Sequence, residues 1–557
     1  MDSMTAVVPT IILMLVIPFA AGGFHGYVLA GCSIFLAGLL LVRIRKQKNV
    51  IVYGNIGFAA VAVLFLTAVL TPLWAADRGM AWFGILRWMP VFLLAVYWMQ
   101  CSPEEKDRAL DYVPLCGGIM TAVSLLLLAV PGIRSYLTVN GRLAGFFQYP
   151  NTFAVFLLAG FVRNVFSSAG KKKRLVLNVL LLTGIVLSGS RTVFVLLVAA
   201  LAAIWVEKKR SASWKEIMLG LLLALGLGLL FSEAGFLSNA DRYTKISMTS
   251  GTFLVRLLYF KDALKLIVSH PFGLGYLGYR ALEGSIQTGR YYVTYVHNGF
   301  LQLLLDFGWI PAILMGTAFL RALASGRMPS GNKLMLALIL AHSLLDYDTE
   351  FFSVWVILLS LLPLHYGREI SLKKFVPVVI ACCAAASLWL GLSELCYYTQ
   401  RVDWCLRLTP FHTDALVYQL SREEKPERQE AMAETILEYD PMNALAWTAK
   451  ANGAFRRGDI PAMIEYNEKA LRSKKYSVEA CCNYLDKLYA AMQISLQLGD
   501  RSGAGLCASR ILTVPEWMAE VSSGTDPLAY RTGDDSSMIL PEVYRNLVQQ
   551  IQSLTMS

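Results

Sequence analysis

The chain has 557 residues, of which 56% are hydrophobic and 16% charged, and its formal net charge at pH 7 is +11. This composition excludes an ordinary soluble globular protein and indicates a polytopic membrane protein. The positive charge predicts no nucleic-acid partner, because basic cytoplasmic loops give membrane proteins such an excess. The ten cysteines lack metal-ligand spacing such as C-x-x-C, so they predict no zinc site.

Apolar segments of membrane-spanning length occupy the first 394 residues, and the remainder is polar and charge-rich. We therefore expect an all-α fold, with a membrane helix bundle of 12–13 spans over 1–394 and a helical domain over 395–557. The first segment lacks a basic n-region and a cleavage site, which predicts a retained helix. The predicted spans are 5–23, 25–42, 51–75, 80–100, 109–131, 147–165, 174–189, 192–206, 216–232, 297–320, 333–346, 350–366 and 374–394.

The charge of the loops predicts the orientation of these spans. In a thirteen-span topology, the loops on one side carry 21 Lys and Arg residues, whereas the opposite short loops carry four. Because basic loops stay in the cytoplasm, we expect a cytoplasmic N-terminus and an extracytoplasmic C-terminal domain. The longest loop, 233–296, then also lies outside. A loop of this length in a compact domain is usually functional, and part of it has helical periodicity before Pro271.

Polar residues gather at the predicted outer ends of the spans. Arg142 precedes one span, and Arg191 lies in the near-loopless turn of LSGSRTVF. Arg256 lies in the long loop, and His297 opens the next span. The arginines can instead extend to lipid phosphates, and the histidine can be a packing residue. We favour a functional site because charge at membrane depth is costly and these residues converge on one face.

Five further residues are candidates with alternative structural roles. Arg87 lies inside a predicted span, where it either pairs with an acid or contacts substrate. His342 and Asp346 are four residues apart, which places them on one helix face, and they can simply pair there. Asn298 follows the histidine and either orients its ring or binds sugar, and Asn151 lies in the QYPN segment near Arg142.

This set of residues suits glycosyl transfer from a lipid diphosphate sugar to an acceptor alcohol. Arginine forks bind phosphate oxygens and stabilise a diphosphate leaving group. A neutral histidine accepts the proton of an attacking hydroxyl. We expect neither a cofactor nor a metal, because no acidic pair with metal-binding spacing stands out. The DYDTE run that begins at Asp346 is the alternative place for a metal.

Four segments, taken in order, resemble the O-antigen ligase and O-antigen polymerase superfamily of bacterial membrane glycosyltransferases. They are GRLAGFFQYPNTFAVFLLAG, LLTGIVLSGSRTVFVLLVAALA, LVRLLYFKDALKLIVSHPFGLGYLGYR and YVHNGFLQLLLDFGWIP, within residues 50–365. The resemblance implies a GT-C-like bundle in the bacterial cytoplasmic membrane. It also implies metal-independent, inverting transfer from undecaprenyl diphosphate on the outer side, to a glycan, lipid or protein acceptor. Ligase and polymerase share these motifs, so the resemblance does not separate them.

The resemblance also assigns roles to individual residues. It implies that His297 activates the acceptor hydroxyl and that Arg142, Arg191 and Arg256 engage the diphosphate. Arg280 lies in the same loop as Arg256 and is an alternative for the third arginine. Two aromatic positions depart from the family pattern, with tyrosine at 259 where tryptophan is common and at 279 where phenylalanine is common. We expect neither departure to touch the chemistry.

The C-terminal part contains a segment that matches a tetratricopeptide pattern. Residues 443–476 place Trp447, Gly458 and Tyr466 where such repeats pack two helices, and the flanking segments suggest two to three repeats. A stack of this kind presents a groove for a peptide or protein partner. The alternative is a short helical bundle that only caps the membrane domain.

Two other functions remain open alongside the enzyme. A flippase for lipid-linked sugars is compatible with thirteen spans, but such transporters often have internal repeats with broken helices, and no repeat between halves is evident. An envelope scaffold explains the C-terminal repeats but not the arginines. The gathering of unusual residues on one face favours chemistry at the membrane surface.

Overall fold

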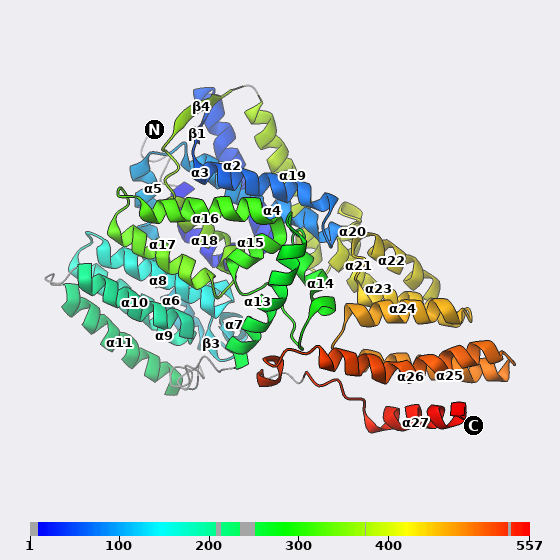
Figure 1. Cartoon of the computed structure of the whole chain (residues 1–557). Coiled ribbons are helices and arrows are strands. Elements are labelled where there is room, and N and C mark those ends of the chain that lie inside the picture. Colours follow the sequence, from blue (N-terminus) through cyan, green and yellow to red (C-terminus); the bar gives the residue numbers. More distant parts are fainter. Residues whose placement is uncertain are drawn as a thin grey trace.

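The computed structural model describes residues 9–207, 213–233, 235, 251–373, 375–532 and 536–556, and the described chain is all-α apart from two small sheets. Figure 1 shows a large helical body continued by helices that project from one side of it. The helices of the body include α2 (Gly26–Gln47), α3 (Ile56–Leu70), α4 (Arg78–Trp98), α5 (Pro103–Ala109), α6 (Tyr112–Leu127), α7 (Pro131–Leu137), α8 (Pro150–Phe166), α9 (Lys171–Ser188), α10 (Arg191–Glu207), α11 (Ser213–Glu233), α13 (Gly251–Ser269), α14 (Gly278–Ile286), α15 (Gly299–Phe307), α16 (Trp309–Ala324), α17 (Ser330–Ser343), α18 (Phe352–Leu361) and α19 (Val376–Tyr398).

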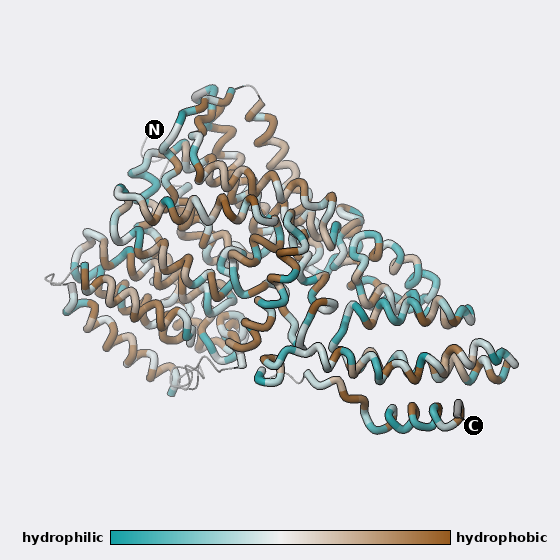
Figure 2. The backbone as a smooth tube through the Cα atoms, in the orientation of Figure 1, coloured by the Kyte–Doolittle hydropathy of each residue, from teal (hydrophilic) through white to brown (hydrophobic). Residues whose placement is uncertain are grey.

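The protein is a membrane protein by the length and apolarity of its helices. Among the described residues, six helices are long and apolar enough to cross a membrane. Shorter apolar helices accompany them, including Pro9–Phe19 and α8. In Figure 2 the body is predominantly hydrophobic, whereas the projecting helices are more hydrophilic. The total of thirteen spans remains a prediction, because several of the expected spans are helices too short to cross by themselves.

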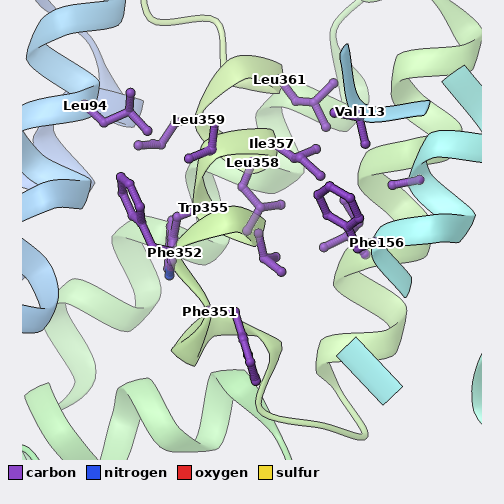
Figure 3. Packing of buried hydrophobic residues seen from close by; sticks show 14 of the residues in the cluster. Leu94, Val113, Phe156, Phe351, Phe352, Trp355, Ile357, Leu358, Leu359 and Leu361 are labelled. Atoms are coloured by element: carbon purple, nitrogen blue, oxygen red, sulfur yellow. The ribbon is translucent and has the colours of Figure 1, made fainter. Parts of the chain in front are cut away.

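The core of the body surrounds α18, the most buried apolar helix. All ten of its residues are buried, which explains why this short helix has no polar face. Figure 3 shows Phe352 and Trp355 among side chains from neighbouring helices, such as Leu94 of α4 and Phe156 of α8. Trp355 lies edge-on to Trp88 with ring centroids 5.1 Å apart, and this contact joins α18 to α4.

Contacts between distant segments join ends that the predicted topology places on the same side. Strand β1 (Val50–Gly54) pairs antiparallel with β4 (Arg368–Leu372); β1 begins at the end of one predicted cytoplasmic loop, and β4 lies within another. Arg163 at the end of α8 binds Asp107 before α6 and Asn332 at the start of α17. A second small sheet, β2 (Thr138–Val139) with β3 (Arg142–Leu143), lies at the opposite ends of the helices.

The predicted span 297–320 is wrong as a single helix, because it is divided into α15 and α16 at Gly308. Gly308 has φ +81° and ψ −170°, a conformation that essentially only glycine adopts. A Cβ there would lie 2.2 Å from the carbonyl oxygen of Pro271. The glycine therefore lets the loop after α13 pack against the break, which sets the position of α15 and of the loop before it.

We expect Gly308→Ala to lower the free energy of unfolding by more than about 3 kcal/mol, because strain and a backbone clash add together. Thermal unfolding of the detergent-solubilised protein measures this loss. Gly316→Ala is the matched control, since this glycine lies inside α16 with its nearest neighbouring atom 3.8 Å from the added Cβ. Equal melting temperatures for the two variants would contradict the assigned role of Gly308.

The C-terminal helices form antiparallel hairpins. They are α20 (Val402–Leu408), α21 (Thr413–Leu420), α22 (Pro426–Tyr439), α23 (Ala444–Arg456), α24 (Ile460–Ser473), α25 (Val478–Gln497), α26 (Arg501–Ser523) and α27 (Glu542–Met556). Trp447 of α23 and Tyr466 of α24 stack with centroids 5.6 Å apart, and Gly458 turns the chain between them with φ +72°. The two residues pack as the repeat pattern predicts, while membership of the tetratricopeptide class remains a prediction.

These hairpins contact the segment of the body between α13 and α15. Arg280 of α14 binds Asp414 of α21 through both terminal guanidinium nitrogens, Nη1 at 3.0 Å and Nη2 at 2.6 Å. The backbone amide of Lys475 donates to Gly284, and that of Asp526 donates to Thr288. The C-terminal helices therefore lie on the same face of the body as α13 and α14.

Candidate functional site

His297 lies in the loop directly before α15, and its side chain is 22% exposed. The neighbouring Asn298 caps α15, because its side-chain oxygen accepts hydrogen bonds from the amides of Phe300 and Leu301, each 3.0 Å long. Asn298 thus has a structural role that differs from the two expected from sequence, ring orientation and sugar binding. The cap fixes where the helix begins and so holds His297 at its end.

The imidazole of His297 faces a buried carboxylate. Nδ1 lies 3.1 Å from Oδ1 of Asp346, whose side chain is 2% exposed. Asp346 also accepts hydrogen bonds of 2.7 Å from the Tyr149 hydroxyl and from the Asn151 amide, and one of 3.0 Å from the backbone amide of Tyr347. Four donors around one carboxylate hold it rigidly and favour its anionic form.

The protonation of this pair follows from its surroundings. Burial raises the pKa of Asp346, but the hydrogen bond from His297 and the nearby charge of Arg256 outweigh it, so the net pKa lies below its usual range. The carboxylate can then only accept, and Nδ1 of His297 is the donor. That tautomer leaves the lone pair of Nε2 available as a base. In this arrangement the carboxylate orients an imidazole that can accept a proton.

Arg256 of α13 completes the same cluster. Its guanidinium donates 2.8 Å to the Leu345 carbonyl, and another of its nitrogens lies 3.6 Å from Oδ2 of Asp346 and 3.4 Å from Nδ1 of His297. The side chain is 19% exposed, so a bound anion can still reach it. Of the two arginines that the sequence left as alternatives, Arg256 is the one beside His297, whereas Arg280 is bound to Asp414.

Arg142 connects this cluster to the turn between α9 and α10. Its Nε donates 2.7 Å to the Ser188 carbonyl, and its guanidinium also donates to Asn151, which in turn binds Asp346. Arg191 is the half-buried first residue of α10, three positions beyond Ser188. Arg142 and Arg256 thus both reach Asp346, one through Asn151 and one through a direct ion pair.

The expected pairing of His342 with Asp346 is wrong. Helix α17 ends at Ser343, so Asp346 lies in the following turn and not on the same helix face. His342 instead contacts Asp348, with Nδ1 2.6 Å from Oδ2, and both side chains are fully buried. The chain turns away from helical geometry one residue after Ser343, and this turn directs the Asp346 side chain to His297.

The three acids of the DYDTE run face three different basic side chains. Asp346 lies against His297, Asp348 against His342, and Glu350 against Arg87, whose Nε is 3.2 Å from the Glu350 carboxylate. Arg87 also donates to the Glu350 carbonyl and to the Tyr276 hydroxyl. Of the two roles that the sequence allowed for Arg87, the structure shows the pairing with an acid. Within the part of the chain that the structure describes, no group of three or more His, Cys, Asp and Glu residues is arranged to hold a metal ion.

Aromatic rings surround His297. Tyr347 lies edge-on to its ring with centroids 5.0 Å apart, and Tyr259 lies 5.8 Å away on another side. Tyr259, one of the two positions that depart from the family pattern, therefore contacts His297 directly. Tyr279 is fully buried, and its hydroxyl lies 3.3 Å from that of Tyr291.

A cavity of about 510 Å³ opens beside His297. Residues of α2, α4, α14 and α19 line it, together with the 292–297 segment and Tyr347. His412 and Asp414, at the start of α21, form a further part of its wall. A space of this size accommodates a sugar-sized group next to the imidazole.

Sequence reasoning missed the partners that position His297. Tyr149 was not singled out, although it stands directly before the helix-initiating Pro150 in the same QYPN segment as Asn151. Asp346 was named, but with the wrong partner. The available signal was the alternation of acids in DYDTE, which is difficult to reconcile with one face of a helix.

The comparisons with known proteins bear on the same region. Residues 176–316 match the model of the O-antigen ligase family. This range contains Arg191, Arg256 and His297 but neither Arg142 nor Asp346. No curated protein gave a match to the chain. The family match supports a glycosyltransferase-like function in a membrane and agrees with the superfamily resemblance of the four sequence segments.

Proposed function

We propose that the protein is a membrane glycosyltransferase that moves a glycan from undecaprenyl diphosphate to an acceptor hydroxyl. The observation that carries the proposal is the His297–Asp346 pair, with Arg256 within 3.6 Å of Asp346, beside a cavity. The family match over 176–316 supports the same assignment. The reaction takes place on the outer side of the bacterial cytoplasmic membrane, where the C-terminal helices also lie.

The proposed step is a single displacement. Nε2 of His297 takes the proton of the acceptor hydroxyl as its oxygen bonds to the anomeric carbon. The bond from that carbon to the diphosphate oxygen breaks, and the electron pair leaves with the diphosphate. Attack from the face opposite the leaving group inverts the anomeric centre. Asp346 keeps the imidazole oriented and stabilises the imidazolium that forms, as a carboxylate partner does in hydrolase triads.

The arginines act on the leaving group. Arg256, Arg142 and Arg191 carry permanent positive charge, which offsets the charge that develops on the departing diphosphate. Because Arg142 and Arg256 both connect to Asp346, the diphosphate and the base are held in one frame. This frame needs no metal to neutralise the diphosphate, and we propose metal-independent transfer on that basis.

The test of the donor site uses purified protein in vesicles that contain the undecaprenyl-diphosphate-linked glycan. We expect Arg256→Gln to lower kcat/KM for release of undecaprenyl diphosphate about tenfold to a hundredfold, the effect of one charge-assisted hydrogen bond. Arg290→Gln is the control, because this exposed arginine lies in the same 233–296 loop as Arg256 but outside the cluster. An Arg256→Gln enzyme as active as Arg290→Gln would refute the assignment of Arg256 to the diphosphate.

A further inference from the structure

The cavity beside His297 has two different kinds of wall. One is formed by the membrane body and includes Tyr276, Tyr295 and Tyr347. The other is formed by the end of α19 and the start of α21, with Tyr397, His412 and Asp414. The C-terminal helices therefore form part of the same enclosure as the proposed base. The polar side chains of His412 and Asp414 in this wall favour a role in the site over a role as a cap of the bundle alone.

Charged side chains that line this cavity have partners of opposite charge, some within the lining and some behind it. Arg280 binds Asp414, and Nε2 of His412 lies 3.5 Å from Glu394 while its Nδ1 accepts from the Ala415 amide. Arg87 is neutralised by Glu350. A wall of internally paired charges offers hydrogen bonds without net charge. It therefore suits a ligand that is rich in hydroxyl groups and uncharged, rather than a diphosphate.

Tyrosines form another part of the lining, beside apolar residues such as Phe83, Leu86 and Leu277. The hydroxyls of Tyr276 and Tyr295 lie 2.8 Å apart, so these two rings are held in place. Tyr292 also lines the cavity and is 68% exposed, so its ring is not part of the hydrophobic core. Tyrosine combines an apolar ring face with a hydroxyl, the pairing that a sugar ring with C–H and O–H groups requires.

The wall from the C-terminal helices is held firmly against the body. Thr413 donates 2.7 Å to Oδ1 of Asp77, the residue that caps α4. Gly79 allows this approach, since a Cβ there would lie 2.1 Å from the Phe411 carbonyl oxygen. The 411–414 segment is thus docked on the first turn of α4, and the cavity keeps its shape without a ligand.

We propose that this cavity binds the acceptor as a carbohydrate end, and that the first C-terminal helices complete the binding site. This inference rests on the proposed glycosyltransferase function. It assigns to the C-terminal region a direct part in selecting the acceptor, in addition to any protein partner. The acceptor sugar lies between the tyrosine wall and the 412–414 segment, with its reactive hydroxyl toward Nε2 of His297.

The test fills the cavity from an exposed position. Thr294 is exposed and lines the cavity, so Thr294→Trp reduces its volume without disturbing the core. Thr513→Trp is the control, because this threonine is exposed on α26, outside the cavity lining. We expect Thr294→Trp to raise KM for the acceptor at least tenfold. Thr513→Trp should keep KM for the acceptor and the rate of undecaprenyl diphosphate release within twofold of the unmodified enzyme.

A binding measurement keeps the inference falsifiable apart from turnover. Saturation-transfer NMR uses the free oligosaccharide repeat unit released from the surface polysaccharide of the host. Binding to the unmodified protein and to Thr513→Trp, lost in Thr294→Trp, supports the inference. No binding to the unmodified protein, or equal binding to all three, overturns it. Absence of donor turnover in the unmodified protein would instead count against the proposed function, whatever the binding result.

Discussion

His297→Ala is expected to lower kcat for glycan transfer by about 10²–10⁴-fold, the range that a positioned general base contributes. The physical reason is that Nε2 is the proposed acceptor of the hydroxyl proton, and alanine leaves nothing in its place. The measurement is the rate of undecaprenyl diphosphate release, with acceptor present, by purified protein in vesicles.

The fold should survive this substitution. His297 lies in a loop and is 22% exposed, while the helix that follows is capped by Asn298 and not by the histidine. Melting temperature and elution profile should therefore match the unmodified protein. Transfer at the unmodified rate by a correctly folded His297→Ala protein would eliminate the histidine as the base.

Asp346→Asn is expected to have the second largest effect, a loss of about 100-fold or more in kcat. Asparagine keeps the shape of the side chain but loses the charge that stabilises the imidazolium, and its amide can donate to Nδ1 and select the wrong tautomer. Because Asp346 also pairs with Arg256, KM for the donor should rise as well, but by less than kcat falls. Steady-state kinetics that measure kcat and the donor KM separately therefore test this prediction, which expects the larger change in kcat.

Asp348→Asn is the matched control for this prediction. Asp348 is two residues away and equally buried, but it binds His342, Ser343 and Thr152 instead of His297. We expect this variant to melt at a lower temperature, because it leaves a buried network incomplete, while each folded molecule stays within a few-fold of normal turnover. The account of the pair fails if the two variants lose kcat to the same extent.

Much of the body could be predicted because apolar length determines it directly. Helices α4, α8 and α19 begin and end within a few residues of the predicted spans 80–100, 147–165 and 374–394. The division at Gly308 could not be predicted in the same way, since the apolar pattern of α15 runs on into α16. What breaks the helix there is a positive φ that accommodates the Pro271 carbonyl, a contact with a different part of the chain.

The candidate site was predictable in its residue types but not in its pairings. His297 and Arg256 stood out because charge and imidazole are unusual at the ends of membrane helices. The partner of His297 did not, since 49 residues separate it from Asp346 and a one-dimensional pattern favoured the nearer His342. The pairing depends on where α17 ends, and helix ends are the least reliable feature of any sequence pattern. The sheet between β1 and β4 was missed for the same reason of distance.

The most direct test of the central claim, that His297 drives glycan transfer from the lipid carrier, is a gel profile of surface and lipid-linked glycans. It compares the unmodified host strain, a deletion strain, and a strain with His297→Ala at matched protein level. We expect both mutants to lose the same product. Long chains that persist on undecaprenyl diphosphate identify a ligase, and collapse to single repeat units identifies a polymerase. A His297→Ala profile identical to that of the unmodified strain, with a clear defect in the deletion strain, would contradict the account.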